Sequence, residues 1–225
     1  MKKTILTAAV FLITLALGFG QESSRPQTEF LFSHDKGISF SGFGGPLVEF
    51  SNVDGAFGVF IGGGGAAIIN QTFFFGGYGM GLTTDQPRYS ITLMGENGFP
   101  KPLNDLCPQI GHGGFWLGYI HQSHKIIHLA LSTKIGWGGI TYTQGYYGNR
   151  VEELGTDGIF VFTPQAEVEV NLLRWFKLNL GLGYRWVAGA DSQYITPTGP
   201  QSLLSSGSLS SPIGTVTFMF GNFVK

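Results

Sequence analysis

Alternation between polar and apolar side chains is the clearest pattern in the chain. Over residues 163–172 every second side chain is polar: Thr163, Gln165, Glu167, Glu169 and Asn171. Because successive side chains of a β-strand point to opposite faces, this segment predicts a strand with one polar and one apolar face. The alternation resumes over residues 177–186, where Lys177, Asn179 and Arg185 take the polar parity. The two segments together predict a long hairpin.

Several other segments show the same period, namely residues 48–51, 73–82, 89–94, 127–138 and 215–220. In most of them one parity carries small or polar side chains, and the other carries large apolar or aromatic ones. A membrane barrel uses this pattern, because lipid contacts the large side chains and a narrow lumen accepts the small or polar ones. A soluble β-sandwich with a polar outer face is the alternative. Residues 57–69 are apolar on both parities, which leaves their facing undecided.

The lengths of the connections predict an orientation for such a barrel. Tight turns are expected at residues 122–126 and 172–175, whereas long polar or Pro/Ser-rich loops are expected at 96–111, 144–157 and 189–210. Outer-membrane barrels place short turns on the periplasmic side and long loops outside. The three long loops are therefore predicted to be extracellular, where an envelope protein could bind them.

The number of strands follows from counting back from the C-terminus. This count gives nine strands from about Pro46 onward, and a single-chain bacterial barrel has an even number. Residues 37–43 supply the missing strand if residues 44–46 form a turn. We therefore predict an all-β fold, an antiparallel up-and-down transmembrane β-barrel of about ten strands, with eight as the alternative.

The N-terminus has the features of an export signal. Lys2 and Lys3 precede an apolar run from residue 5 to 17, and Gly18 and Gly20 stand where a signal peptidase requires small residues. The run is shorter than the ~20 residues of a membrane-spanning helix. The expected organisation is a signal peptide over residues 1–20, an N-terminal periplasmic segment over 21–36, and an outer-membrane barrel over 37–225.

Composition excludes several other classes of protein. The 36 glycines disfavour a helical bundle, and 14% aromatic with only 12% charged residues disfavours disorder. The formal net charge of −1 gives no electrostatic reason to expect a nucleic-acid partner. Lipid of the outer membrane is the expected partner of the apolar surface. The single cysteine excludes an internal disulfide.

The expected lumen carries an unusual number of charges for so apolar a chain. Seven residues are predicted to form one lumen network: Glu49, His128, Lys134, Glu167, Glu169, Lys177 and Arg185. One hypothesis is a charged constriction that selects solutes. The other is a structural network in which opposite charges neutralise one another and fill a narrow bore, and this interpretation is favoured because eight to ten strands leave little space.

Reactive or metal-binding groups are few. His121, His124 and His128 lie near one tight turn, but no carboxylate or thiol nearby in sequence completes a zinc site. The run His121-Gln122-Ser123 is superficially similar to the His-x-Ser of outer-membrane lipid A deacylases, although the predicted orientation puts it at the periplasmic rim. We expect no cofactor, no metal and no catalytic residue.

The order of several glycine-aromatic runs carries a family resemblance. The runs are Gly42-Phe43-Gly44-Gly45-Pro46, Glu49-Phe50-Ser51, Gly62 to Gly65, Gly76-Gly77-Tyr78-Gly79, Gly183-Tyr184-Arg185 and Phe218-Met219-Phe220-Gly221-Asn222-Phe223. From about Gly37 to the C-terminus the chain resembles small uncharacterised outer-membrane β-barrel proteins of Bacteroidota. The resemblance implies fold and location, and it assigns no activity to particular residues.

Two functional hypotheses follow from the sequence, and an enzyme is a third. The first is a structural or interaction role in the cell envelope, in which a narrow barrel presents its long loops to a partner. The second is a narrow pore or transporter for small or apolar solutes. A lipid-modifying membrane enzyme is the least favoured, with Ser123 as its one candidate nucleophile.

Overall fold

A computed structural model describes residues 38–95, 97–145 and 148–223 of the chain. These residues belong to one compact unit that begins at Ile38. The predicted signal peptide, residues 1–20, and the predicted periplasmic segment, residues 21–36, lie outside the described residues.

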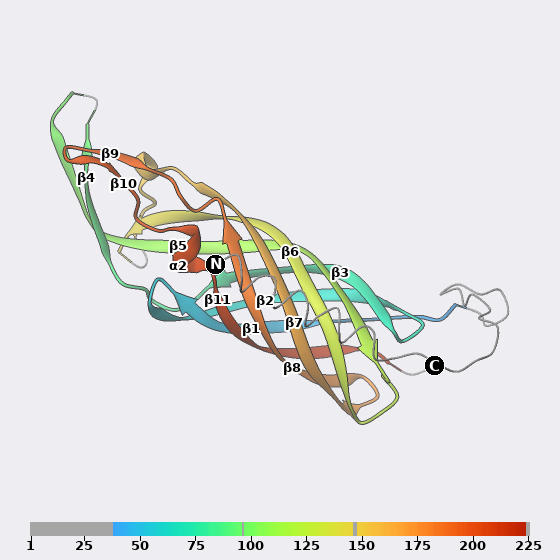
Figure 1. Ribbon diagram of the computed structural model, residues 1–225. Helices are drawn as coiled ribbons and strands as arrows, with labels where there is room; N and C mark the ends of the chain where they lie inside the picture. The colour runs from blue at the N-terminus through green and yellow to red at the C-terminus, as the bar shows by residue number, and fades with distance from the viewer. Residues whose placement is uncertain (1–37, 96, 146–147, 224–225) are drawn as a thin grey trace, which may run out of the picture. The chain divides into compact units, whose positions relative to one another are not determined.

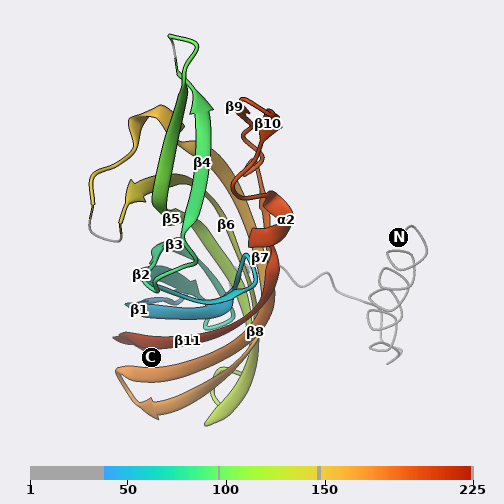
Figure 2. The same cartoon turned by 90° about the vertical axis from the view of Figure 1, so that its left-hand side faces the viewer.

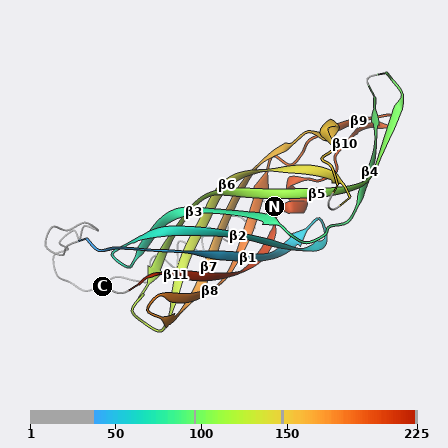
Figure 3. The same cartoon turned by 180° about the vertical axis from the view of Figure 1, so that it is seen from behind.

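Eight antiparallel strands form a closed barrel (Figures 1 and 3). They are β1 (Phe40–Val53), β2 (Ala56–Ile69), β3 (Phe73–Leu82), β5 (Pro100–His121), β6 (Ile127–Gln144), β7 (Asp157–Leu173), β8 (Phe176–Ala188) and β11 (Ser211–Asn222). The hydrogen-bonded order is β3-β2-β1-β11-β8-β7-β6-β5, and pairing of β3 with β5 closes the ring. The predicted fold class is confirmed, with the alternative number of strands.

Smaller elements extend from the barrel or cover one end of it. Strand β4 (Tyr89–Met94) pairs with the first residues of β5, and together they form an arm that projects beyond the ring (Figure 2). The other elements are a 3-10 helix η1 (Glu152–Leu154), a hairpin of β9 (Tyr194–Thr196) and β10 (Gly199–Gln201), and a short helix α2 (Ser206–Leu209). No helix in the described part of the chain is long and apolar enough to span a membrane.

The predicted turn at residues 44–46 is absent, because β1 runs straight through it. Pairing with β11 lapses between Gly44, opposite Phe220, and Leu47, opposite Thr217. A Cβ at position 45 would lie 1.8 Å from the carbonyl oxygen of Phe218, so only glycine allows this close approach. The strand therefore tolerates Pro46, which donates no ladder hydrogen bond. The predicted strand over residues 37–43 and the one predicted from about Pro46 are therefore a single strand.

The predicted loop over residues 96–111 is wrong in its extent. Strand β5 already begins at Pro100 and is 22 residues long. Its first part continues beyond the ring and pairs with β4, which explains why the predicted strand over residues 89–94 takes no part in barrel closure. The other two long connections occur as predicted, between β6 and β7 and between β8 and β11.

The connections differ in length between the two ends of the barrel, apart from the short turn between Val53 of β1 and Ala56 of β2, which lies at the end that carries the long ones. Strand β1 begins and β11 ends at one end, which we call the terminal end, together with the short turns after β2, β5 and β7. The arm and the two long connections lie at the opposite end, which we call the loop end (Figure 1).

The outer surface of the barrel is apolar, as strand β6 illustrates. Leu129, Leu131 and Trp137 are exposed, whereas the alternating His128 and Lys134 are buried. From residue 127 to 137 this row extends roughly 33 Å along the strand at ~3.3 Å per residue. A tilt of about 40° reduces its height to roughly 25 Å, which matches the apolar band of membrane barrels.

The interior has two chemically different halves. The half formed by β6, β7, β8 and β11 carries most of the buried polar side chains, while Glu49 and Ser51 of β1 and His112 of β5 are buried in the other half. The half formed by β1, β2, β3 and β5 is instead filled by rings, namely Phe43, Phe60, Phe74, Tyr78 and Trp116. The expectation that glycine faces the lumen is wrong for Gly77 and Gly79 of β3, which are exposed while Tyr78 between them is buried. The large rings of this half face inward because they fill interior volume that the charged side chains do not occupy.

Candidate functional site

All seven residues predicted for the lumen network are buried, with exposed fractions of at most 4%. Their strands are β1 for Glu49, β6 for His128 and Lys134, β7 for Glu167 and Glu169, and β8 for Lys177 and Arg185. The register places β6, β7 and β8 side by side, so most of these side chains are neighbours across the ladder. Six of the seven divide into three groups, and Lys134 lies apart from them.

The group nearest the terminal end is centred on Glu169. Its Oε2 lies 2.9 Å from Nε2 of His128 and 3.5 Å from Nζ of Lys177. Asn179 donates to Oε1 at 3.5 Å. Nδ1 of His128 lies 3.0 Å from the carbonyl oxygen of Lys125, so both ring nitrogens of His128 face an oxygen atom.

Glu167 forms the second group through hydrogen bonds from neutral donors. Ser132 Oγ donates to Oε1 at 2.6 Å, and Asn179 Nδ2 donates to Oε2 at 2.9 Å. Gly181 stands opposite Glu167 in the register and leaves the space that this carboxylate occupies. A Cβ at position 181 would lie 2.4 Å from Thr215 Oγ1 and 3.2 Å from Glu167 Cγ.

The third group links Arg185 of β8 to Glu49 of β1, with strand β11 between the two. Nη1 of Arg185 donates to Glu49 Oε1 at 2.7 Å and to Ser51 Oγ at 3.1 Å. Nη2 and Nε donate to the carbonyl oxygen of Leu209 at 3.0 and 3.2 Å, and the guanidinium lies 4.5 Å from the ring centre of Phe60. Because Leu209 ends helix α2, this arginine also anchors the long β8–β11 connection.

Lys134 lies between the charged and the aromatic halves. Its Nζ is 5.5 Å from the ring centre of Trp116 and 5.9 Å from that of Tyr78, which are cation–π distances. Tyr78 Oη in turn lies 3.1 Å from Nδ1 of His112. Sequence reasoning missed His112 and Trp116, although both share one parity of β5. Because residues 96–111 were predicted to be a loop, the inward-facing positions of β5 were not recognised as part of a strand.

The barrel is filled at the level of Arg185. The cavity bounded by Phe60, His112, Arg185 and Leu209 has a volume of about 10 Å³. That space accommodates about one water molecule. Glu49 and Lys134 are also nearly inaccessible, with exposed fractions of 0% and 1%. The predicted charges therefore line a packed interior at this level rather than a water-filled bore.

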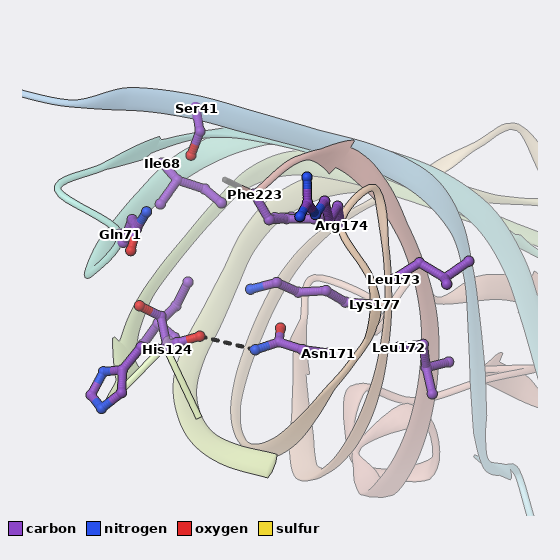
Figure 4. Close-up of a pocket in the computed structure, with 12 residues that line it drawn as sticks. Ser41, Ile68, Gln71, His124, Asn171, Leu172, Leu173, Arg174, Lys177 and Phe223 are labelled. Carbon is purple, nitrogen blue, oxygen red and sulfur yellow. Dashed lines mark hydrogen bonds between the residues drawn. The ribbon is translucent and has the colours of Figure 1, made fainter. Parts of the chain in front are cut away.

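A larger pocket opens at the terminal end (Figure 4). We call this cavity of about 570 Å³ the mouth pocket. Arg174, Lys177 and His124 supply its basic side chains, while Ile68, Ile120 and Phe223 form apolar walls. Figure 4 shows Lys177 reaching from β8 toward the wall that carries Ile68 and Gln71.

The three histidines around the β5–β6 turn point in different directions. His121 and His124 are exposed, whereas His128 is buried against Glu169. Within the described ranges, no group of three or more His, Cys, Asp or Glu side chains is arranged to hold a metal ion. Ser123 lines the mouth pocket, and its carbonyl oxygen accepts a hydrogen bond of 3.0 Å from Asn171.

Comparison with known proteins gives one structural likeness. The crystal structure of Neisserial surface protein A (NspA) is similar with a TM-score of 0.53 and 9% sequence identity. The match covers 84% of this chain and 100% of that chain. No protein-family model matches the chain, and no curated protein matches it significantly. At this identity the likeness shows a shared barrel fold.

Proposed function

We propose that this chain is an outer-membrane β-barrel protein whose closed barrel anchors a rigid extracellular surface for a protein partner. Residues 1–20 direct its export, and the loop end faces outward. The apolar outer surface supports this placement, with Trp137 and Trp186 exposed toward the loop end and Trp175 toward the terminal end. Membrane barrels carry aromatic residues at both interfaces. The similar solved structure is described as a surface protein.

The single observation that carries the interaction role is the packed interior at Arg185. Opening a path for a solute there requires breaking the buried Arg185–Glu49 ion pair and moving Leu209 with helix α2. Separating a buried pair leaves uncompensated charge and costs about 3–5 kcal/mol. This cost favours a structural or interaction role over the pore or transporter.

The loop end is itself packed, which supports its use as a binding surface. Leu106, Ile140, Tyr142 and Leu154 are buried there, with exposed fractions of 0–4%. Tyr194 Oη donates to the carbonyl oxygen of Leu154 at 3.3 Å. Burial, together with the nearby Asp157 carboxylate, raises the pKa of Tyr194 to about 12, so the hydroxyl stays protonated at neutral pH. A preorganised surface loses less entropy on binding.

The arm offers apolar anchors on this rigid base. Phe99 and Met94 at its tip are 76% and 41% exposed, and Ile195 on the adjacent β9–β10 hairpin is 73% exposed. Arg88 fixes the base of the arm through ion pairs of 3.0 Å to Asp85 and 3.1 Å to Asp105. Exposed aromatic and aliphatic side chains of this kind form the centres of protein interfaces.

Two experiments test the placement and the closed interior. An epitope inserted between residues 97 and 98 should bind antibody on intact cells, whereas one between residues 124 and 125 should require a permeabilised outer membrane. The reverse accessibility would refute the orientation. In planar bilayers the purified protein should show no steady conductance, and a stable pore of porin size would refute the closed barrel.

A third experiment tests the partner surface. A photo-crosslinking amino acid at position 99 should yield a discrete cross-linked product on intact cells. The matched control is position 104, an exposed polar residue on the same arm. Equal products at both positions, or none at position 99, would contradict binding through the apolar tip.

A further inference from the structure

The mouth pocket is built largely from residues outside the buried charge network. Its walls come from the start of β1, from the turns after β2, β5 and β7, and from Phe223 after β11, so five separate segments converge on it. Its volume of about 570 Å³ falls within the range of small-molecule sites. In the proposed orientation it opens toward the periplasm.

The pocket has a net positive lining. Arg174 and Lys177 carry its positive charge, and no Asp or Glu is among the described residues that line it. Lys177 is partly compensated, since its Nζ lies 3.5 Å from Glu169 Oε2. Arg174 forms no ion pair with any described residue. A guanidinium without a counter-ion beside a buried ammonium group is suited to a carboxylate.

Neutral hydrogen-bonding groups lie beside these charges. Ser41, Gln71 and Ser123 line the same space (Figure 4 shows Ser41 and Gln71). Gln71 holds a left-handed backbone conformation, with φ of +56°. Glycine would adopt this conformation without strain, whereas glutamine adopts it at a cost in backbone energy. A purely hydrocarbon ligand would leave these polar side chains without hydrogen-bond partners.

The remaining wall is apolar and deep. Ile68 and Ile120 are buried with exposed fractions of 3% and 2%, and Phe223 covers the Nζ of Lys177 with its ring centre 4.5 Å away. A ligand that satisfies the whole lining therefore needs an anionic head, an adjacent hydrogen-bonding group and a compact apolar side group.

We propose that the mouth pocket binds an N-acyl amino-acid carboxylate with an apolar side chain, which is the chemistry of the last residue of a peptide. Arg174 and Lys177 hold the carboxylate, Ser41, Gln71 and Ser123 contact the amide, and the side chain packs on Ile68 and Ile120. The ligand source is either a free N-acyl amino acid or the C-terminus of a longer chain.

The test uses the full chain in zwitterionic lipid nanodiscs and measures binding of N-acetyl-leucine by ligand-observed NMR. Saturable binding is expected, and N-acetyl-leucinamide and 4-methylpentanoate should each bind at least tenfold more weakly. Arg174→Gln should weaken N-acetyl-leucine binding at least tenfold. Lys125→Gln, which removes an exposed charge from the β5–β6 turn outside the pocket lining, should leave it unchanged.

The outcomes separate cleanly. Tighter binding of an acetylated tripeptide ending in leucine supports the proposal with a peptide C-terminus as source, and equal binding supports it with a free N-acyl amino acid. No saturable binding overturns the proposal. The proposal is also overturned if N-acetyl-leucinamide or 4-methylpentanoate binds as tightly as N-acetyl-leucine. It is overturned as well if the Arg174→Gln variant binds N-acetyl-leucine as tightly as the original chain does. Heat-modifiable gel migration verifies that each variant remains folded.

Discussion

Breaking the ion pair between Arg185 and Glu49 should destabilise the barrel more than any exposed ion pair does. Arg185→Met removes the 2.7 Å charge-assisted hydrogen bond and leaves the Glu49 carboxylate buried without a counter-charge. Oε2 of Glu49 already lacks a hydrogen-bond partner among the described residues. Losing one partner of a buried pair costs about 3–5 kcal/mol of unfolding free energy.

The double variant distinguishes charge coupling from simple loss of packing. Glu49→Leu alone strands the guanidinium, although the carbonyl oxygen of Leu209 still accepts from it at 3.0 and 3.2 Å. Replacing both residues removes both buried charges, so the double variant should be more stable than the sum of the single costs predicts. We expect a coupling energy of about 2–3 kcal/mol.

The assay is reversible urea unfolding of the protein in phosphatidylcholine vesicles, followed by the fluorescence of its four tryptophans. The exposed pair Lys101–Glu153 on the loop side gives the control cycle, in which the substitutions should be additive. A stabilising buried ion pair between Arg185 and Glu49 is refuted if either single substitution costs less than about 1 kcal/mol, or if the cycle at this pair is also additive.

Three further predictions concern the lumen, the lipid surface and the loop end. Gly118→Ala should lower the unfolding free energy, because the added Cβ would lie 2.2 Å from a ring atom packed inside the barrel. Gly79→Ala is the control and should be neutral, because its Cβ meets no atom within 4 Å. Equal effects of the two substitutions in urea unfolding would contradict this prediction. Leu180→Arg on the apolar outer surface should cost about 2–4 kcal/mol in vesicles, and a change within ±0.5 kcal/mol would indicate a surface facing water. Hydrogen bonds from the Ser206 hydroxyl and amide lower the pKa of Asp191, so the contact is complete at neutral pH and is lost as the pH falls through that lowered pKa. Amide exchange at Ser206 should accelerate in acid, and a pH-independent exchange pattern, once corrected for intrinsic rates, would exclude the link.

The aromatic half of the lumen and the mouth pocket were harder to predict than the charged half. Over residues 163–172 of β7 and 177–186 of β8, polar or small residues alternate with apolar ones, so Glu167, Glu169 and Arg185 stand out from the sequence alone. On β3 and over residues 113–120 of β5 both parities are apolar or glycine, and the facing of Tyr78 and Trp116 depends on which face has room for a ring. The mouth pocket has no local pattern, because its residues come from five separate segments.

The sequence by itself determined the β class, the apolar surface, the buried charges and the short turns near residues 122–126 and 172–175, because each depends on local alternation or local turn chemistry. Tertiary structure decided that eight strands close the ring, since strand number depends on which strands pair. A close approach between Gly45 and Phe218 allows β1 to pass through a Gly-Gly-Pro sequence that locally favours a turn. Tertiary structure also decided that β4 lies outside the ring, because β5 pairs with β3 along the barrel and with β4 only beyond the barrel.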